Sequence, residues 1–140
     1  MIKISIIAPI YGVERYIVKF ADSVLSQTYS NIEFIFVNDG TKDRSMELLD
    51  ELIASKYEHL RPQIKIVNKE NEGLPAARRT GMEHATGEYI LFADSDDWLE
   101  VDAAEKIMRE FNLVLSIYHP QNSLYRNLSI SLDLICNYKL

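Results

Sequence analysis

The sequence contains a single cysteine, Cys136, among its 140 residues. One cysteine cannot form an intramolecular disulfide, so packing of the core has to hold the fold. Proteins without disulfides are typical of reducing compartments. We therefore expect a cytoplasmic protein.

Long apolar runs are also missing. No window reaches the roughly 20 apolar residues of a membrane-spanning helix. The N-terminal stretch MIKISIIAPIYG has only a short apolar run and one lysine, and it lacks the longer apolar stretch and small-residue cleavage site of a secretory signal. It is typical of a first strand. We expect no transmembrane segment, and peripheral contact with a membrane stays open.

Positive charge is in the minority, with 15 Lys and Arg against 21 Asp and Glu and a formal net charge of -6. Nucleic acids and anionic membranes repel such a chain. The composition therefore excludes a basic groove and predicts no nucleic-acid partner, while leaving room for local basic sites.

Charge of either sign is scarce near the C-terminus. Residues 111–140 contain only three charged residues, Arg126, Asp133 and Lys139. We predict a core domain over residues 1–110 and a divergent or truncated tail over residues 111–140. Within the tail, the apolar run Asn112–Tyr118 favours a fifth strand.

Apolar runs and helical spacings alternate along residues 1–110. Near-continuous apolar runs predict strands over Ile2–Ala8, Phe34–Val37, Ile64–Val67 and Tyr89–Ala93, with Pro9 and Gly12 ending the first. Apolar residues at helical spacing predict helices over 13–25, from an Asp43 N-cap to Tyr57, from Leu74 to before Gly87, and over Val101–Phe111. This alternation predicts an α/β fold with a mainly parallel sheet covered by helices on both faces, incomplete at its C-terminus.

Polar residues follow three of the predicted strands. They are Pro9-Ile-Tyr11-Gly12, Asn38-Asp39-Gly40-Thr41 and Asp94-Ser-Asp96-Asp97. In an open parallel sheet, ligands bind beyond the carboxyl ends of the strands, where the strand order reverses. We expect these three segments to meet at that edge.

Asp94 and Asp96 are two positions apart, so in an extended segment their carboxylates point the same way. Such a pair suits a hard divalent cation, Mn²⁺ or Mg²⁺. The alternative is that Asp96 or Asp97 caps the next helix. Capping accounts for one aspartate but not for three.

Three other polar features have both an ordinary and a functional reading. Asp39 before Gly40 is typical of a turn, but an acid that ends a second strand can also bind a nucleoside. Arg78 can lie on a solvated helix face or hold an anion. The turn Asn71-Glu-Gly73 offers backbone N–H groups to an anion.

Taken together, these segments resemble the family 2 glycosyltransferases of the GT-A fold. The matching stretches are ISIIAPIYGVERYI, SVLSQTYSNIEFIFVNDGTKDRS and NKENEGLPAARRTGMEHATGEYILFADSDDWL, over roughly residues 3–105. Three differences stand out: Gly12 where Asn is common, Asn38-Asp39-Gly40-Thr41 for DDGS, and Ala77-Arg78-Arg79 for ARN.

The resemblance implies transfer of a sugar from a nucleotide-diphosphate donor, usually UDP-linked, to an acceptor hydroxyl with inversion. By the same resemblance, the residues beside the nucleoside are Pro9, Tyr11 and Glu14, and Asp39 contacts uracil. Those near the base or phosphates are Lys69, Asn71 and Arg78. Asp94 lies toward the ribose, and Asp96 holds the metal ion with Asp94 as its D-x-D partner.

The residue that deprotonates the acceptor is not identified, because residues 111–140 do not match the acceptor-binding half of the family. Asp133, the only carboxylate there, has no assigned role. Two hypotheses remain: an active transferase, and a non-catalytic nucleotide-sugar-binding module left by truncation. A dinucleotide-dependent oxidoreductase is disfavoured because the first strand lacks a G-x-G-x-x-G turn, and a receiver-like domain because that strand ends without an acid.

Overall fold

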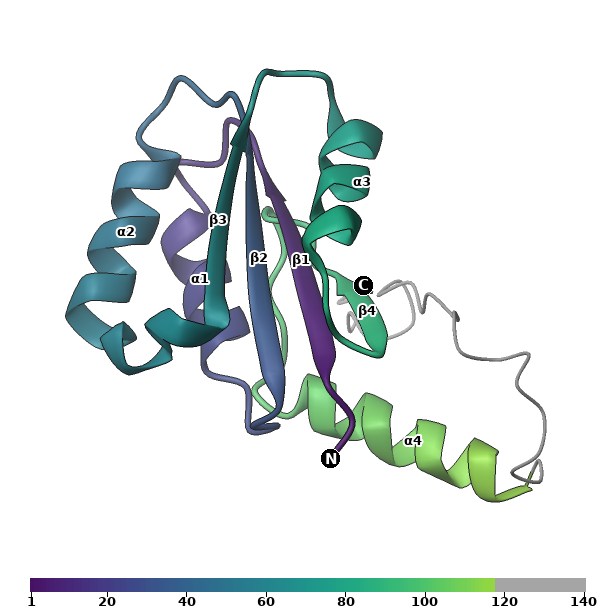
Figure 1. Ribbon diagram of the computed structural model, residues 1–140. Helices are drawn as coiled ribbons and strands as arrows, with labels where there is room; N and C mark the ends of the chain where they lie inside the picture. The colour runs from purple at the N-terminus through teal and green to yellow at the C-terminus, as the bar shows by residue number, and fades with distance from the viewer. Residues whose placement is uncertain (118–140) are drawn as a thin grey trace, which may run out of the picture.

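The computed structural model describes residues 1–117. Its elements, in chain order, are β1 (Ile4–Ile10), α1 (Ile17–Leu25), β2 (Ile32–Asp39), α2 (Ser45–Lys56), the 3₁₀ helix η1 (Glu58–Gln63), β3 (Ile64–Lys69), α3 (Leu74–His84), β4 (Tyr89–Phe92) and α4 (Ala103–Ile117). The predicted alternation of strands and helices is therefore confirmed (Figure 1).

The four strands form one parallel sheet in the order β3-β2-β1-β4. Helices α1 and α2 lie on one face and α3 on the other (Figure 1). This is the predicted α/β arrangement, a parallel sheet covered by helices on both faces, and it is Rossmann-like. The order reverses between β1 and β4, so the ligand crevice expected of such a sheet lies at the carboxyl ends of these two strands.

Side chains of β1 alternate between two apolar clusters. Ile4, Ile6, Ala8 and Ile10 join the larger cluster, which also contains buried residues of α1, α2 and α4. Ile7 points to the opposite face and packs with Ile35, Val37 and Ala77 of α3. Since both faces of β1 are covered, its sequence is apolar at almost every position.

Pro9 does not end β1, as the sequence had indicated, but lies inside it opposite Val37. Ile4 donates to Asn31 O on the β2 side, whereas Ile7 O accepts from Ala93 N on the β4 side. Odd-numbered residues of β1 thus face β4, and the pairing with β4 ends at Ile7. Proline is tolerated because the N–H it lacks would have no partner there.

The C-terminal helix differs most from expectation. A helix was expected to end at Phe111 and a strand to follow over Asn112–Tyr118, but α4 continues to Ile117. The strand prediction is wrong up to that residue, and Tyr118 lies outside the described residues. A short apolar run fits a helix as well as a strand, so periodicity could not distinguish them. No helix within residues 1–117 is both long and apolar enough to cross a membrane.

Helix α1 also begins later than predicted, at Ile17, because Val13–Tyr16 forms a turn in which Tyr16 N donates to Val13 O at 2.8 Å. The predicted start of α3 at Leu74, with Pro75 in its first turn, is confirmed.

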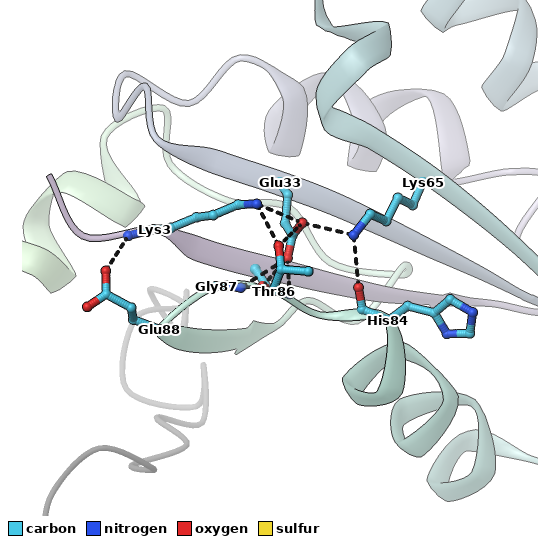
Figure 2. A network of polar contacts seen from close by, with 8 residues as sticks. Lys3, Glu33, Lys65, His84, Thr86, Gly87 and Glu88 are labelled. Carbon is cyan, nitrogen blue, oxygen red and sulfur yellow. Dashed lines mark hydrogen bonds and ion pairs between the residues drawn. The ribbon is translucent and has the colours of Figure 1, made fainter.

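At the amino edge of the sheet, a buried carboxylate joins the strands (Figure 2). Glu33 of β2 accepts from Ser5 Oγ of β1 at 2.6 Å and forms ion pairs of 3.1 Å with Lys3 and Lys65. It also accepts the backbone N–H groups of Thr86 and Gly87, just before β4. Burial raises the pKa of Glu33, but these hydrogen bonds outweigh burial and hold the pKa well below its usual range.

Candidate functional site

Asp39, the last residue of β2, is the centre of a polar cluster at the carboxyl edge of the sheet. Its side chain is 4% exposed. Oδ1 accepts from Lys69 Nζ and Glu72 N, both at 3.1 Å. Oδ2 accepts from Gly73 N at 2.9 Å and Asn71 Nδ2 at 3.3 Å. Three predicted donor-site residues, Asp39, Lys69 and Asn71, are thus brought together.

The loop over Asp39 depends on two glycines. Gly40 has φ +68°, and a Cβ at this position would lie 2.9 Å from Asn71 N. Gly73 has φ +91° and precedes α3, with its N–H directed at Asp39. Both φ values favour glycine. Two backbone N–H groups of the turn Asn71–Gly73, those of Glu72 and Gly73, thus donate to the carboxylate of Asp39.

Burial raises the pKa of Asp39, but the N–H groups of Glu72 and Gly73 and the Lys69 ammonium outweigh burial and lower the pKa below its usual value. Asp39 is therefore ionised at neutral pH. A carboxylate offers about four acceptor positions, and the four donors named above occupy them. In this state Asp39 orders the loop that precedes α3.

A second pair lies where β4 ends. Arg78 of α3 donates from Nη2 to Asp94 Oδ1 at 2.7 Å, and its guanidinium carbon lies 5.3 Å from the centre of the Phe92 ring. Arg78 Nε is buried and has no hydrogen-bond partner among the described residues. Arg78 therefore lies at this edge of the sheet, where the sequence predicted it.

Asp96 and Asp97 follow Asp94 in an exposed turn in which Asp97 N donates to Asp94 O at 3.1 Å. Helix α4 begins only at Ala103. Asp96 and Asp97 are therefore too far from its first turn to act as the helix cap.

The number of carboxylates after β4 fits a divalent cation of the Mg²⁺ or Mn²⁺ type. Within residues 1–117, no three His, Cys, Asp or Glu side chains gather as a complete metal cage. One or two carboxylates are what Mg²⁺ usually takes from a protein, with phosphates and water as the other ligands. Asp96 and Asp94 are the carboxylates that could supply this share.

The remaining predicted residues lie at the end of β1. Pro9 is buried, and Tyr11 is 57% exposed. Glu14 contacts the two residues just before α2, since its Oε2 accepts from Arg44 N at 3.2 Å and its own N–H donates to Asp43 Oδ2 at 3.0 Å. Glu14 therefore helps to join the β1 and β2 ends, a contact that its predicted place beside the nucleoside did not include.

Further contacts between the ends of β1 and β2, which the sequence did not predict, involve Thr41 and Asp43. Thr41 Oγ1 accepts from Gly12 N at 2.9 Å and donates to Asp43 Oδ1 at 2.8 Å. Asp43 also accepts the N–H of Ser45, the first residue of α2, at 3.1 Å. The N-cap of this helix is Arg44, so the prediction of Asp43 as the N-cap is wrong by one residue. Burial raises the pKa of Asp43, but hydrogen bonds from Ser45 and Thr41 lower it to about 2.

A parallel sheet with this order and charged residues beyond β2 and β4 defines a Rossmann-like α/β protein. The chain belongs to glycosyl transferase family 2, whose sequence model matches residues 5–123.

Two curated relatives and one solved structure illustrate the similarity. Glycosyltransferase GlyA of Streptococcus pneumoniae is 44% identical over 108 residues, which are 77% of this chain and 15% of GlyA. Chondroitin synthase of Pasteurella multocida is 36% identical over 108 residues, 77% of this chain and 11% of the synthase. The crystal structure of S. aureus TarS 1-349 in complex with UDP-GlcNAc is similar at TM-score 0.66 and 26% identity, over 79% of this chain and 31% of that one. The chain thus spans a small part of the relatives it matches.

Proposed function

We propose that this chain forms the donor-binding part of an inverting glycosyltransferase that takes its sugar from a UDP-linked donor with the help of Mn²⁺ or Mg²⁺. The observation that carries the proposal is the Arg78–Asp94 pair close in sequence to the exposed Asp96, after the carboxyl end of β4 and on the side of the sheet where the strand order reverses. This edge combines a cation for phosphate with carboxylates for a metal ion.

The donor class is supported by the comparisons. TarS, with which this chain shares 26% identity, has been crystallised with UDP-GlcNAc. In the proposed site the nucleoside lies near Tyr11 and Asp39, and Lys69, Asn71 and Arg78 face the base or the phosphates. Contact between Asp39 and uracil requires one of its four present hydrogen bonds to be exchanged.

Cleavage of the sugar–phosphate bond leaves negative charge on the departing diphosphate. A bound divalent ion supplies Lewis-acid stabilisation of that charge. Asp96, with Asp94 beside it, would hold the ion. Arg78 adds a fixed positive charge, which stabilises the same group without reorganisation.

Calorimetry of UDP binding with and without Mn²⁺ tests the proposal. We expect the wild type to bind UDP more tightly with Mn²⁺, and Asp96→Asn to lose that gain. Asp50→Asn is the matched control, because Asp50 is also an exposed carboxylate but lies on α2. Its side chain is 64% exposed and pairs with Arg61.

The outcomes separate the parts of the proposal. If the wild type does not bind UDP, the nucleotide site is wrong. If it binds UDP equally with and without Mn²⁺, the metal role is wrong. If Asp96→Asn keeps the whole gain, the ion is held elsewhere.

A second candidate function is a module that binds the nucleotide sugar without transferring it. The residues assembled here all belong to the proposed donor side, which both functions share. Release of UDP from UDP-sugars, measured with and without saccharide acceptors, distinguishes them, because only a transferase accelerates release when the correct acceptor is present.

A further inference from the structure

Helix α1 and the residues just after it are joined to the segment that follows the carboxylate cluster by contacts between residues more than 70 positions apart. Ser23 Oγ accepts from Leu99 N at 3.0 Å. Gln27 Nε2 donates to Glu100 O at 2.7 Å. Thr28 N donates to Val101 O at 2.9 Å. Residue Ser23 of α1 and the two residues Gln27 and Thr28 just after this helix therefore hold three consecutive residues of the segment.

Gln27 makes a further contact with the start of α4. Its Oε1 accepts from Ala104 N at 2.9 Å. Ala104 lies in the first turn of α4, where backbone N–H groups have no partner within the helix. Gln27 thus supplies a cap from another element while its amide nitrogen holds Glu100 O.

The same segment is also held at its N-terminal end. Ala93 N donates to Ile7 O at 2.9 Å, and Asp94 pairs with Arg78 of α3. Asp96 and Trp98 lie between this anchor and the Leu99 anchor on α1. Lys19 of α1 adds a contact in between, with its Nζ 3.6 Å from the centre of the Trp98 ring. The backbone that carries Asp96 is thus fastened at both ends.

We propose that Gln27 and Ser23 are positioning residues that hold Asp96 where it binds the metal ion of the nucleotide donor. They act through Leu99, Glu100 and Ala104 and touch neither the metal nor the donor. The inference rests on the proposed function and adds a role for the stretch SVLSQT, which belongs to the family resemblance but is remote from the strand ends.

A metal ligand is useful only in a narrow range of positions, and the groups that orient ligands typically contribute 10–100-fold to metal affinity. Without Gln27, the segment keeps the Ser23 and Thr28 contacts but loses its hold on Glu100 and on α4. We expect the loss of Gln27 to reduce the gain in UDP affinity that Mn²⁺ provides and to leave the UDP affinity without Mn²⁺ unchanged.

The chain contains one tryptophan, Trp98, so its fluorescence reports directly on this segment. We expect Gln27→Ala to lower the fluorescence anisotropy of Trp98 and to increase its quenching by acrylamide. Asn31→Ala is the matched control, because Asn31 Nδ2 makes a comparable tertiary hydrogen bond at 2.7 Å whose acceptor, Met1 O, lies outside the 94–104 segment.

In calorimetry we expect Gln27→Ala to reduce the Mn²⁺-dependent gain in UDP affinity by about tenfold or more. Ser23→Ala serves as the milder variant should Gln27→Ala fail to fold, since it removes one contact with the segment, that of Leu99 N, besides the local hydrogen bond from Ser23 Oγ to Phe20 O within α1. Ser23→Thr keeps the hydroxyl and should restore the gain. Asn31→Ala should keep the wild-type gain.

Two failures can be told apart. A wild type without any Mn²⁺-dependent gain overturns the proposed function and this inference with it. A wild-type gain that both Gln27→Ala and Ser23→Ala retain, together with unchanged Trp98 anisotropy, overturns the positioning role alone.

Discussion

The carboxylate of Asp39 accepts the backbone N–H of Gly73 at 2.9 Å, and this contact joins the end of β2 to the start of α3. It is one of four hydrogen bonds that hold the loop before Arg78. The buried acid thereby links the two parts of the proposed donor site.

Replacing Asp39 with Asn should destabilise the fold. The amide NH₂ would face an N–H donor at whichever oxygen position it takes, and the ion pair with Lys69 would be lost. An unsatisfied buried donor costs about 1–3 kcal/mol. Urea unfolding measures this cost, and Asp50→Asn, at an exposed pair, should change stability little. Equal losses in the two variants would contradict the role given to Asp39.

Glu33 should make stability depend on pH in the acid range. Its folded-state pKa lies below the ordinary value of 4.5, so the ionised form stabilises the fold above that pH. This contribution is lost as pH falls below about 4.5 toward the folded-state pKa. We expect Glu33→Gln to cost about 1–3 kcal/mol at pH 7 and the difference from wild type to narrow in acid.

Urea unfolding between pH 7 and pH 3 measures that difference. Glu47→Gln is the control, because Glu47 pairs with Arg44 on the surface, where both side chains are more than half exposed. Its effect should be small at every pH. A Glu33→Gln deficit that stays constant down to pH 3 would show that the charge of Glu33 does not contribute.

Gly81→Ala should overpack the smaller core. A Cβ at Gly81 would lie 2.3 Å from Ile7 Cγ2, so α3 or β1 has to move. Overpacking costs about 1–3 kcal/mol. Ile7→Ala removes the obstructing methyl group and leaves a cavity of its own. The double variant should therefore lose less stability than the two single variants added together, and simple additivity would contradict the clash.

Arg78→Lys should weaken UDP binding. A lysine keeps the charge but loses the planar guanidinium that reaches Asp94 while resting near Phe92. We expect a loss of about tenfold in affinity, equivalent to about 1.4 kcal/mol. Arg79→Lys is the matched control on the exposed neighbouring position. The assignment of Arg78 fails if both variants bind UDP as the wild type does.

Much of the fold could be predicted because its signals are local. Apolar runs such as Phe34–Val37 predicted strands, and Leu74-Pro75 marked the start of α3 correctly. Errors arose where a distant segment decides the outcome. Pro9 stays in β1 because β4 ends early on that side. The length of α4 was misjudged because a short apolar run has no unique period.

In the candidate site, the residues could be named from the sequence, whereas their contacts could not. Asp39, Lys69, Asn71, Arg78 and Asp94 were all named from the sequence, and their contacts with one another followed only from the folded chain. Glu33 carried a signal, a charge within an apolar strand, that pointed to no particular partner. For Gln27 the sequence contained no signal of a role except that the residue lies in a stretch that resembles the family.

By itself, the sequence determined the class of fold, the family and the residue types at the strand ends, because periodicity and motifs are properties of neighbouring residues. The tertiary structure decided which side chains satisfy one another. Asp39 meets Gly73 across 34 positions and Gln27 meets Ala104 across 77. Such pairs are set by packing of the sheet and its helices, since a buried polar group takes whichever partner the fold brings within hydrogen-bond distance.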